Sequence, residues 1–341
     1  MDPKQPSAYD AHAKEKELQN ESLQWETSDP KPGTPKDIPI IDVAKYLEDT
    51  SEETELRRLG EQLRWACENV GFYQLVGHGL SIECTEEILE ETRRFHALPE
   101  HVKTKIRMDR PEHPIYLGYR NHKLPTRATP NSNAAFLVKS DHRIDLIRHN
   151  QWPEEAELPD FQYRVRDYAK TITTLAKKLL PIYASALHLP ANYVDKAFDE
   201  PFYRLRMSHY PGMPQQSTSS SFGIAPHVDT SFFTLLLTDG SPGLCLFSHP
   251  RNEWIQMPAL AATNALIVNS GELLRQYSND TFLSVRHFVR NGETERYSVP
   301  FFFNANSDYR IECFPTCCSD DNPPKYPPFS YNESQGVVQG E

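Results

Sequence analysis

The sequence predicts a mainly β protein with flanking α-helices. After residue 200, short runs rich in β-branched and aromatic residues alternate with turn residues, a pattern typical of a β-sandwich or barrel. Before residue 200, apolar residues recur at helical spacing in three long segments. A chain of 341 residues is long enough for one large domain or two ordinary ones with a substantial core.

The first 200 residues supply the flanking helices. The run "DIPIIDVAKYL" around Pro39 predicts a short edge strand, where proline is tolerated. A helix is expected over "TSEETELRRLGEQLRWACENVG", with Thr50 and Glu53 as its capping box and a glycine at its end. "FYQLVGHG" predicts a strand closed by a glycine turn, and "SIECTEEILEETRRFHALP" predicts a second helix. The longest helix is expected over residues 160–188, with a kink at Pro181.

The rest of the chain divides into strands, loops and tails. The predicted strands after residue 200 include "FYRLRMSHYPG", "TSFFTLLL", "GLCLFSH", "EWIQMPA", "NALIVNSGELL", "LSVRHFVR" and "RYSVPFFFNA". Residues 107–158 show little periodicity and are expected to form long loops with short strands, which are often functional. Residues 1–36 are polar and predict a disordered or loosely docked tail. The proline-rich C-terminal end is expected to pack as an extended segment or to hang free.

Composition excludes several classes of function. The formal net charge is -11 and no cluster of Lys or Arg is present, so binding to the nucleic-acid backbone is disfavoured. No apolar run approaches the length of a membrane span, and the N-terminus resembles neither a signal nor a transit peptide. The six cysteines form no C-x-x-C pair, which favours free thiols over a disulfide framework or a soft-metal site. We therefore expect a cytoplasmic protein.

The stretch "APHVDTSFFTLLL" places His227 and Asp229 two residues apart at the start of a core strand. Alternate residues of a strand point to the same face, so these two side chains should project together. "LSVRHFVR" offers His287 on a second strand. Two imidazoles and one carboxylate form a facial triad, which leaves half of an octahedral coordination sphere open and is typical of non-haem Fe(II) oxygenases. Zinc is the main competitor for the same ligands.

A second pair of polar residues lies two positions apart in "ERYSVPFFF". Arg296 and Ser298 share one face of a strand among apolar neighbours, and a guanidinium with a hydroxyl beside it suits a carboxylate. A dicarboxylate co-substrate could then chelate the metal with one end and meet Arg296 with the other. Each residue by itself has a simpler explanation, as a buried histidine or a surface ion-pair partner. The order of H-x-D, a distant His and R-x-S makes the metal hypothesis the stronger one.

With these residues the sequence resembles the Fe(II)- and 2-oxoglutarate-dependent dioxygenases of the isopenicillin-N-synthase-like group. The likeness runs from about residue 38 to 331 and includes "ACENVGFYQLVGHGL", "SHYPG", "PHVDTSFFTLLLTDGSPGLCLF" and "ERYSVPFFFNA" in the family's order. It implies a double-stranded β-helix, or jelly roll, as the core. It also implies an N-terminal non-haem dioxygenase module over 37–150, a catalytic module over 151–331 and a C-terminal tail over 332–341.

The resemblance assigns roles to individual residues. It makes iron ligands of His227, Asp229 and His287. It makes Arg296, Ser298 and Tyr210 the groups that hold the distal carboxylate of 2-oxoglutarate. The family commonly has Asn two residues before this tyrosine, where the present chain has Ser208, so no role is assigned there. Two further asparagines at common family positions, Asn269 and Asn279, are interpreted as turn and loop supports.

The implied activity is oxidation of a small organic substrate with Fe(II), 2-oxoglutarate and O2, and with release of succinate and CO2. The outcome could be hydroxylation, desaturation or ring formation, and secondary metabolism is the family-level expectation. Substrate specificity is expected in residues 107–158 and beyond Phe314. There, Arg120, Asn121, His122, Lys123 and Arg127 would suit a carboxylate or other polar group, with a solvated loop as the simpler alternative. The oligomeric state cannot be inferred.

Alternatives remain open at this point. Isopenicillin N synthase uses a similar Arg/Ser pair for its peptide substrate, so an oxidase without 2-oxoglutarate is one alternative. A non-catalytic jelly-roll binding protein is another, and a protein or peptide substrate is a third possibility. Four aromatic residues, Phe232, Phe233, Phe302 and Phe303, could line an active site, although each is more simply explained as a core residue.

Overall fold

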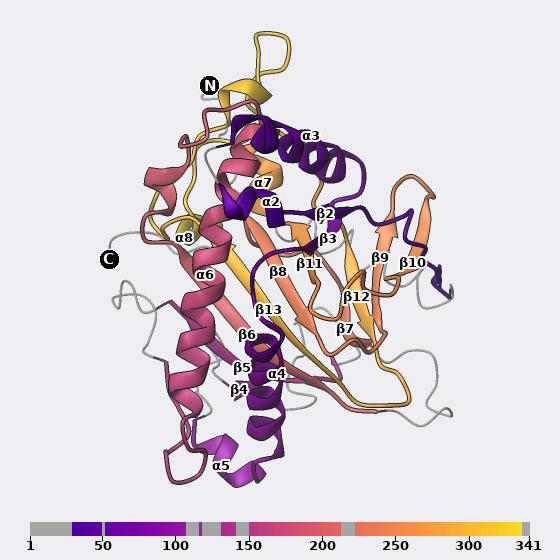
Figure 1. Cartoon of the computed structure of the whole chain (residues 1–341), viewed down its shortest axis with the longest axis vertical. Helices are drawn as coiled ribbons and strands as arrows, with labels where there is room; N and C mark the ends of the chain where they lie inside the picture. Colours follow the sequence, from indigo (N-terminus) through magenta and orange to yellow (C-terminus); the bar gives the residue numbers. More distant parts are fainter. Residues whose placement is uncertain are drawn as a thin grey trace, which may run out of the picture.

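The computed structural model describes residues 29–49, 52–106, 116–117, 131–140, 150–212 and 222–335. Within these residues two β-sheets form the centre of the molecule and helices flank them (Figure 1). This is the mainly β architecture with flanking helices that the sequence predicts. None of the described helices is long and apolar enough to cross a membrane.

The larger sheet has eight strands, and its order places sequence-distant segments side by side. In spatial order these are β2 (Ile40–Asp42), β3 (Phe72–Val76), β11 (Leu266–Ser270), β8 (Phe233–Thr238), β13 (Arg296–Asn304), β6 (Phe202–Tyr210), β5 (Ala134–Lys139) and β4 (Tyr116–Leu117). The β2 strand lies at the edge and pairs in parallel with β3, as predicted for the segment that contains Pro39. All other pairs in this sheet are antiparallel.

The smaller sheet has five strands. In spatial order they are β1 (Lys31–Pro32), β10 (Glu253–Gln256), β9 (Leu244–Ser248), β12 (His287–Arg290) and β7 (Phe222–His227). Because β1 pairs with β10, the end of the predicted N-terminal tail lies on a sheet edge. Residues 1–28 of that tail lie outside the described part of the chain.

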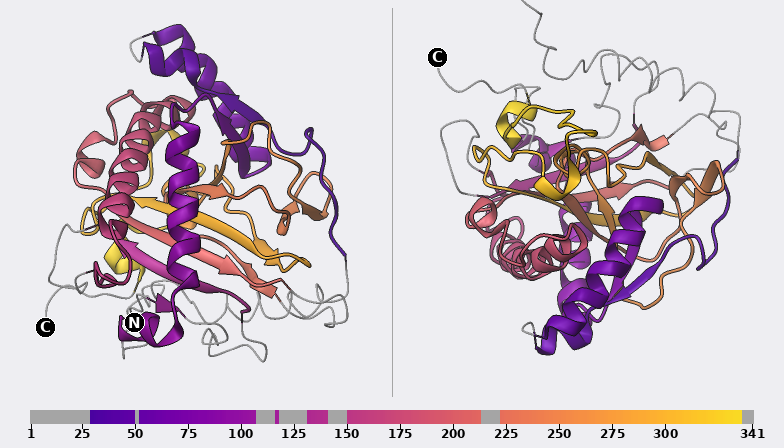
Figure 2. Two further views of the ribbon diagram at one scale, coloured as in Figure 1. Left: turned by 60° about the horizontal axis from the view of Figure 1, so that its bottom comes forward. Right: turned by 90° about the horizontal axis from the view of Figure 1, so that it is seen from above.

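Two long helices cover one face of the larger sheet, α4 (Ile82–Ala97) and α6 (Phe161–Ala186), as both views of the ribbon show (Figures 1 and 2). A third helix, α3 (Glu53–Asn69), packs against α6. The shorter helical segments are α2 (Ala44–Glu48), α5 (Glu100–Lys105), η1 (Asp195–Phe198), α7 (Glu272–Tyr277), η2 (Pro315–Cys317) and α8 (Tyr331–Ser334). The three long helices confirm the three segments predicted from helical spacing, and α6, with 26 residues, is the longest as expected.

One predicted helix start is wrong. The α3 helix begins at Glu53 with Glu52 as its N-cap, and no side chain caps it. Glu53 therefore occupies the first helical position and not the third position that a capping box requires. Thr50 itself lies outside the described residues. The predicted glycine end is confirmed, because Gly71 has a φ of 73° and its N–H donates to Ala66.

Strand alternation gives the larger sheet two faces of different character. We call the face toward α4 and α6 the outer face and the opposite one the inner face. On β13 the outer residues are aromatic or aliphatic and buried, and Phe303 stacks on Phe198 with 5.3 Å between ring centres. The inner residues of β13 include Arg296, Ser298 and Phe302. The outer face is thus the main hydrophobic core, and the inner face carries the polar side chains.

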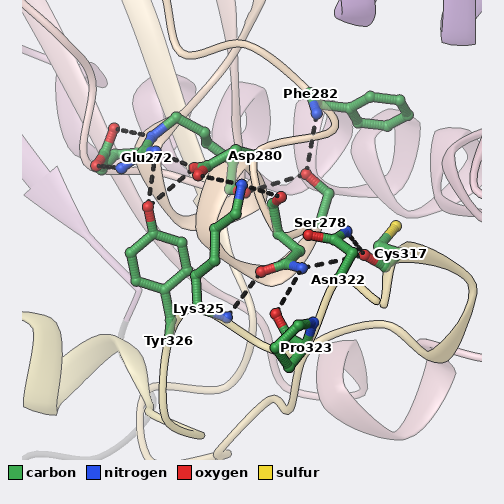
Figure 3. A network of polar contacts seen from close by, with 11 residues as sticks. Glu272, Ser278, Asp280, Phe282, Cys317, Asn322, Pro323, Lys325 and Tyr326 are labelled. Atoms are coloured by element: carbon green, nitrogen blue, oxygen red, sulfur yellow. Dashed lines mark hydrogen bonds and ion pairs between the residues drawn. The ribbon is translucent and has the colours of Figure 1, made fainter. Parts of the chain in front are cut away.

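The C-terminal segment packs on the molecule, which decides between the two alternatives for it up to residue 335. Lys325 and Tyr326 both donate to the carboxylate of Asp280, at 3.0 and 2.9 Å (Figure 3). Arg275 of α7 bonds the same carboxylate and also Tyr326. A short helix, α8, then begins with a complete capping box at Ser330. The segment is therefore fastened to α7, which also contacts the site described next.

Candidate metal centre and anion pocket

Three of the predicted residues meet between the two sheets. His227 ends β7, His287 begins β12, and the two histidines are direct partners in the antiparallel pairing of these strands. Asp229 lies in the connection from β7 to β8. The Nε2 atoms of His227 and His287 each lie 3.5 Å from Oδ1 of Asp229. One ligand atom from each residue lies within 4.8 Å of the others, which is a suitable cluster for a metal ion.

His227 and Asp229 come together for a different reason from the one that the sequence predicts. The sequence predicts that His227 and Asp229 share one strand face, but β7 ends at His227 and Asp229 follows it. Asp229 is held by the larger sheet, since its carboxylate bonds Thr234 of β8 and its backbone carbonyl accepts from the N–H of Glu272 at 2.8 Å. The two ligands therefore converge because the chain crosses from one sheet to the other between them.

Hydrogen bonds orient the donor atoms of this cluster. Nδ1 of His227 lies 2.9 Å from the carbonyl of Ala225, and Nδ1 of His287 lies 3.1 Å from that of Val285. Carbonyl oxygens only accept, so Nδ1 donates its proton and Nε2 keeps a free lone pair in each neutral ring. These bonds to backbone carbonyls fix the ring tautomers in the way that metal-ligating histidines require.

The carboxylate of Asp229 is oriented in the same manner. Its Oδ2 accepts from the hydroxyl of Thr234 at 2.8 Å and from Nδ2 of Asn269 at 2.9 Å. Oδ1 is left to face the two histidines. Two imidazole nitrogens and one carboxylate oxygen thus converge with free lone pairs, and this donor set fits a divalent transition metal.

The three groups shift one another's pKa values. Burial alone would raise the pKa of Asp229, but His287 and His227, when their rings are protonated at Nε2, hold it well below its ordinary value by charge and by hydrogen bonds. Burial and the neighbouring His287 lower the pKa of His227. Burial also opposes the charge on His287, yet the Asp229 carboxylate raises the pKa of His287 overall. The cluster therefore keeps an ionised carboxylate in a buried place.

Arg296 forms a second polar site, near the end of β6. It pairs across the sheet with Tyr210, and its guanidinium carbon lies 5.0 Å from the centre of that ring. Its Nε donates to the carbonyl of Ser241 at 3.3 Å, whereas its buried Nη1 has no hydrogen-bond partner among the described residues. Arg296 also lines a cavity of about 230 Å³. A buried cation with an unsatisfied donor beside a cavity is suited to an anion.

Ser298 and Ser208 complete this end of the inner face. Ser298 follows Arg296 by two residues on the same face, as predicted, and pairs with Ser208 of β6. The hydroxyl of Ser208 accepts from Nε of Arg206 at 3.1 Å. The sequence assigns no role to Ser208. In the structure its hydroxyl holds Arg206, a second arginine on the inner face.

Sequence reasoning misses or misplaces several residues around the site. Asn269 is expected to support a turn, but it lies on β11 and bonds the Asp229 carboxylate. Asn279 does support a loop, because its side chain bonds the segment that carries Pro323 and Lys325. Arg206 is missed, although the alternation R-x-S-x-Y that ends at Tyr210 already places it on the inner face. Thr234 is missed as well.

The four candidate lining aromatics separate by face. Phe232, Phe233 and Phe303 lie in the main hydrophobic core and contact one another or Phe198. Phe302 alone of the four lies on the inner face and is half-buried. The simpler explanation thus holds for three of them. The polar residues Arg120, Asn121, His122, Lys123 and Arg127 lie outside the described part of the chain.

Comparison with known proteins identifies the family. Residues 38–155 match the model of the N-terminal region of non-haem dioxygenases, described as "non-haem dioxygenase in morphine synthesis N-terminal". Residues 201–305 match the model of the 2OG-Fe(II) oxygenase superfamily. The chain is 30% identical over 313 residues to the 2-oxoglutarate-Fe(II) type oxidoreductase hxnY of Emericella nidulans, covering 86% of this chain and 87% of that one. The chain therefore belongs to the 2OG-Fe(II) oxygenase superfamily.

Further relatives agree with this. The 2-oxoglutarate-dependent dioxygenase tropC of Talaromyces stipitatus is 27% identical over 291 residues, which are 81% of this chain and 88% of that one. Among solved structures, a full-length Neurospora crassa protein in complex with alpha-KG and thymine has a TM-score of 0.78 at 24% identity, over 87% of this chain and 95% of that one. This likeness shows the fold, and the predicted double-stranded β-helix core is confirmed.

The family membership settles the class of activity. The protein is an Fe(II)- and 2-oxoglutarate-dependent oxygenase, and its cofactor and co-substrates are Fe(II), 2-oxoglutarate and O2. The predicted class of enzyme is thereby confirmed. The two alternatives, an oxidase without 2-oxoglutarate and a non-catalytic binding protein, find no support among these relatives.

Proposed function

We propose that His227, Asp229 and His287 hold the Fe(II) of this oxygenase. The observation that carries the proposal is the convergence of two Nε2 atoms and one carboxylate oxygen whose other hydrogen-bonding positions are already used. Three ligands on one side of a metal leave the other side for co-substrate and O2. A closed structural zinc site would need a fourth protein ligand, and the described residues provide only these three in the cluster.

We propose that Arg296, Ser298 and Tyr210 hold the distal carboxylate of 2-oxoglutarate. Arg296 is only 3% exposed, and its free Nη1 would gain its missing partner from that carboxylate. The Tyr210 ring beneath the guanidinium keeps the arginine in place. Ser298, at 1% exposure, adds a hydroxyl on the same face. A buried arginine, shielded from water and fixed in position, binds a carboxylate more strongly than an exposed arginine would.

The exposure of the three metal-binding side chains indicates where the substrate approaches. The side chain of His227 is 32% exposed, against 5% for Asp229 and 9% for His287. The reactants therefore reach the centre from the His227 side. When bound, Fe(II) and 2-oxoglutarate supply the oxidising chemistry, in which 2-oxoglutarate becomes succinate and CO2. The protein orients the reactants, fixes the ligand tautomers and keeps water from the buried carboxylate.

We infer a small organic molecule as the substrate. The solved relative from Neurospora crassa binds thymine, which is of that class, and the inner face beside the cluster is half-buried, as a pocket wall is. Secondary metabolism fits the family, and we propose a cytoplasmic location on the cysteine pattern and the N-terminal sequence. The acidic composition argues against nucleic-acid partners.

Anaerobic titration with Fe(II) and 2-oxoglutarate tests the metal site. The wild-type protein should show the visible metal-to-ligand charge-transfer band, and Asp229→Ala should show no band and retain no Fe(II), because it lacks the only anionic ligand. Asp199→Ala removes an exposed carboxylate far along the chain from the cluster and serves as the control. Fe(II) content in Asp229→Ala equal to that of the wild type would show the assignment to be wrong.

The co-substrate site is tested by Arg296→Gln in the same titration. This variant should bind Fe(II) normally but need about 30-fold more 2-oxoglutarate, or more, to reach half of the band, since loss of a buried charge pair weakens binding by about 2 kcal/mol or more. An unchanged requirement for 2-oxoglutarate would place the distal carboxylate elsewhere.

A further inference from the structure

Three positively charged side chains lie together on the inner face of β5 and β6. Arg204 and Arg206 are inner residues of β6, and Lys139 of β5 is the direct cross-strand partner of Arg204. All three are half-buried. We call Lys139, Arg204 and Arg206 the cation cluster.

The cation cluster is at the level of the proposed metal site. One row of paired residues crosses four neighbouring strands of the larger sheet, and at one end of it Thr234 bonds Asp229. The row runs Thr234, Phe302, Arg204, Lys139. With about 4.8 Å between adjacent strands, the backbones of Arg204 and Lys139 lie about 10 and about 14 Å from that of Thr234. The cations are therefore one small molecule's length from the metal ligands.

These cations lack counter-charges among the described residues. No ion pair joins Lys139, Arg204 or Arg206 to a carboxylate there, and the carboxylate that favours the charge of Arg206 from a distance is the buried Asp229. Two half-buried arginines elsewhere do have counter-charges, since Arg275 pairs with Glu272 and Arg64 with Glu68. Three unpaired cations at the wall of a site are unfavourable unless a ligand supplies negative charge.

Ring stacking holds the Arg204 side chain in place, although its hydrogen-bond donors are not all used. The Arg204 guanidinium lies between two rings, 5.7 Å from the centre of Phe302 and 5.8 Å from that of Tyr331, and its buried Nε has no hydrogen-bond partner among the described residues. Lys139 uses only its backbone to bond Asn150. Burial and the neighbouring Arg204 lower the pKa of Lys139 to about 8. Stacking thus fixes the position of the charge and leaves its hydrogen bonds free.

Arg206 connects this cluster to the rest of the inner face. Its Nε donates to Ser208 and its Nη2 donates to Asn133 at 2.9 Å. The inner face around it also carries four half-buried apolar residues, in contrast to the closed outer face. These residues are Leu137, Leu236, Pro300 and Phe302. A ligand with an apolar body and an anionic end would match both features.

We propose that the substrate is a carboxylate-bearing small molecule whose anionic end binds Arg204 and Lys139 while its apolar body lies toward the metal. The proposal rests on the function proposed above and adds the substrate class. It places the recognised carboxylate on β5 and β6, whereas the 2-oxoglutarate carboxylate lies at Arg296. Arginine is suited to this role because its planar fork matches a carboxylate in two hydrogen bonds.

The test compares acids with their neutral amides on the loaded enzyme. Protein saturated with Fe(II) and 2-oxoglutarate under argon, so that Arg296 is occupied, is titrated by calorimetry with benzoate, 4-phenylbutyrate and 6-phenylhexanoate. Benzamide, 4-phenylbutyramide and 6-phenylhexanamide are titrated alongside at equal ionic strength. At least one acid should bind tenfold or more tightly than its amide, and this preference should fall below threefold in Arg204→Gln or Lys139→Gln.

Controls separate this proposal from the previous one. Arg57→Gln removes an exposed cation of α3 and should keep the full preference for the acid. The charge-transfer band of each variant reports folding and 2-oxoglutarate binding, and Lys139→Gln leaves every hydrogen bond of its residue's backbone in place. A normal band with no preference for any acid, or a preference kept by both variants, overturns the substrate proposal alone. A wild-type protein without the band overturns the proposed function and this inference with it.

Discussion

The outer and inner faces of the larger sheet are made by the same strands and differ in almost every physical respect. On β13, Val299 and Phe301 point outward and are not exposed at all, whereas Arg296 and Ser298 point to the inner side. On β6, Leu205 and Met207 face the helices, while Arg204 and Arg206 face inward. A period of two residues thus separates the hydrophobic core from the chemistry within a single strand.

The two faces also treat polar groups differently. On the helix side, the hydroxyls of Tyr73 and Tyr183 bond each other at 3.0 Å. His96 of α4 lies 3.0 Å from the carbonyl of Met207, to which its Nε2 donates. The inner face instead leaves Nη1 of Arg296 and Nε of Arg204 without partners among the described residues. In the part of the chain that the structure describes, neutral atoms without a partner also occur on the helix side, such as Nδ1 of His96 and the hydroxyl of Tyr168, but the unpartnered charged donors, which suit an anionic ligand, lie on the inner face.

The largest difference between the faces should appear in stability. Phe301→Ala removes a fully buried outer ring and should lower the free energy of unfolding by about 3 to 5 kcal/mol. Phe302→Ala, its neighbour on the inner face, should lower it by only about 1 to 2 kcal/mol, because that ring is half-buried. Urea unfolding of both variants measures the difference. Equal losses would mean that the inner face is packed as tightly as the outer one.

A smaller effect, confined to the site, is expected from Asn269. Asn269→Ala removes one of the two hydrogen bonds to Oδ2 of Asp229 and should weaken Fe(II) binding by about 10- to 100-fold, as losses of outer-shell partners do. Asn264→Ala is the matched control, because among the described residues its amide bonds the carbonyl of Leu80, in the loop after β3, and not the metal cluster. Anaerobic Fe(II) titration distinguishes the two variants. If both bind Fe(II) alike, the hydrogen bond to Asp229 does not orient a ligand.

Most of the fold and the core of the site could be predicted from the sequence, for local reasons. The period of 3.6 residues in α6 and the glycines that close β3 depend on neighbouring residues only. The H-x-D and R-x-S patterns identify side chains that share a direction. The pairing of His227 with His287 across β7 and β12, however, depends on residues 60 positions apart. The sequence offered His287 only as a candidate on a second strand, and the family resemblance made it a ligand.

What the sequence could not show is the set of partners that arrive from distant strands. Asn269 resembles a turn residue in the sequence, and its bond to Asp229 exists only because β11 and β8 are neighbours. The capping box at Thr50 failed because a cap pattern fixes a helix start only to within a turn. The meeting of Lys139 with Arg204 likewise requires the pairing of β5 with β6.

The last expected effect concerns the pH dependence of the outer face. Burial lowers the pKa of His96 to about 3, whereas an unfolded histidine titrates near 6.5. Between these pH values His96 is protonated in the unfolded chain but not in the folded one. The free energy of unfolding is therefore highest above pH 6.5 and decreases as the pH falls toward 3. The loss reaches at most about 1.4 kcal/mol per pH unit for one group.

His96→Gln should therefore show a shallower fall of unfolding free energy in urea titrations from pH 7 to 4.5. His101→Gln, at an exposed position of α5, should follow the wild type. Identical slopes for wild type and His96→Gln would mean that this ring accepts a proton inside the fold as readily as in the unfolded chain.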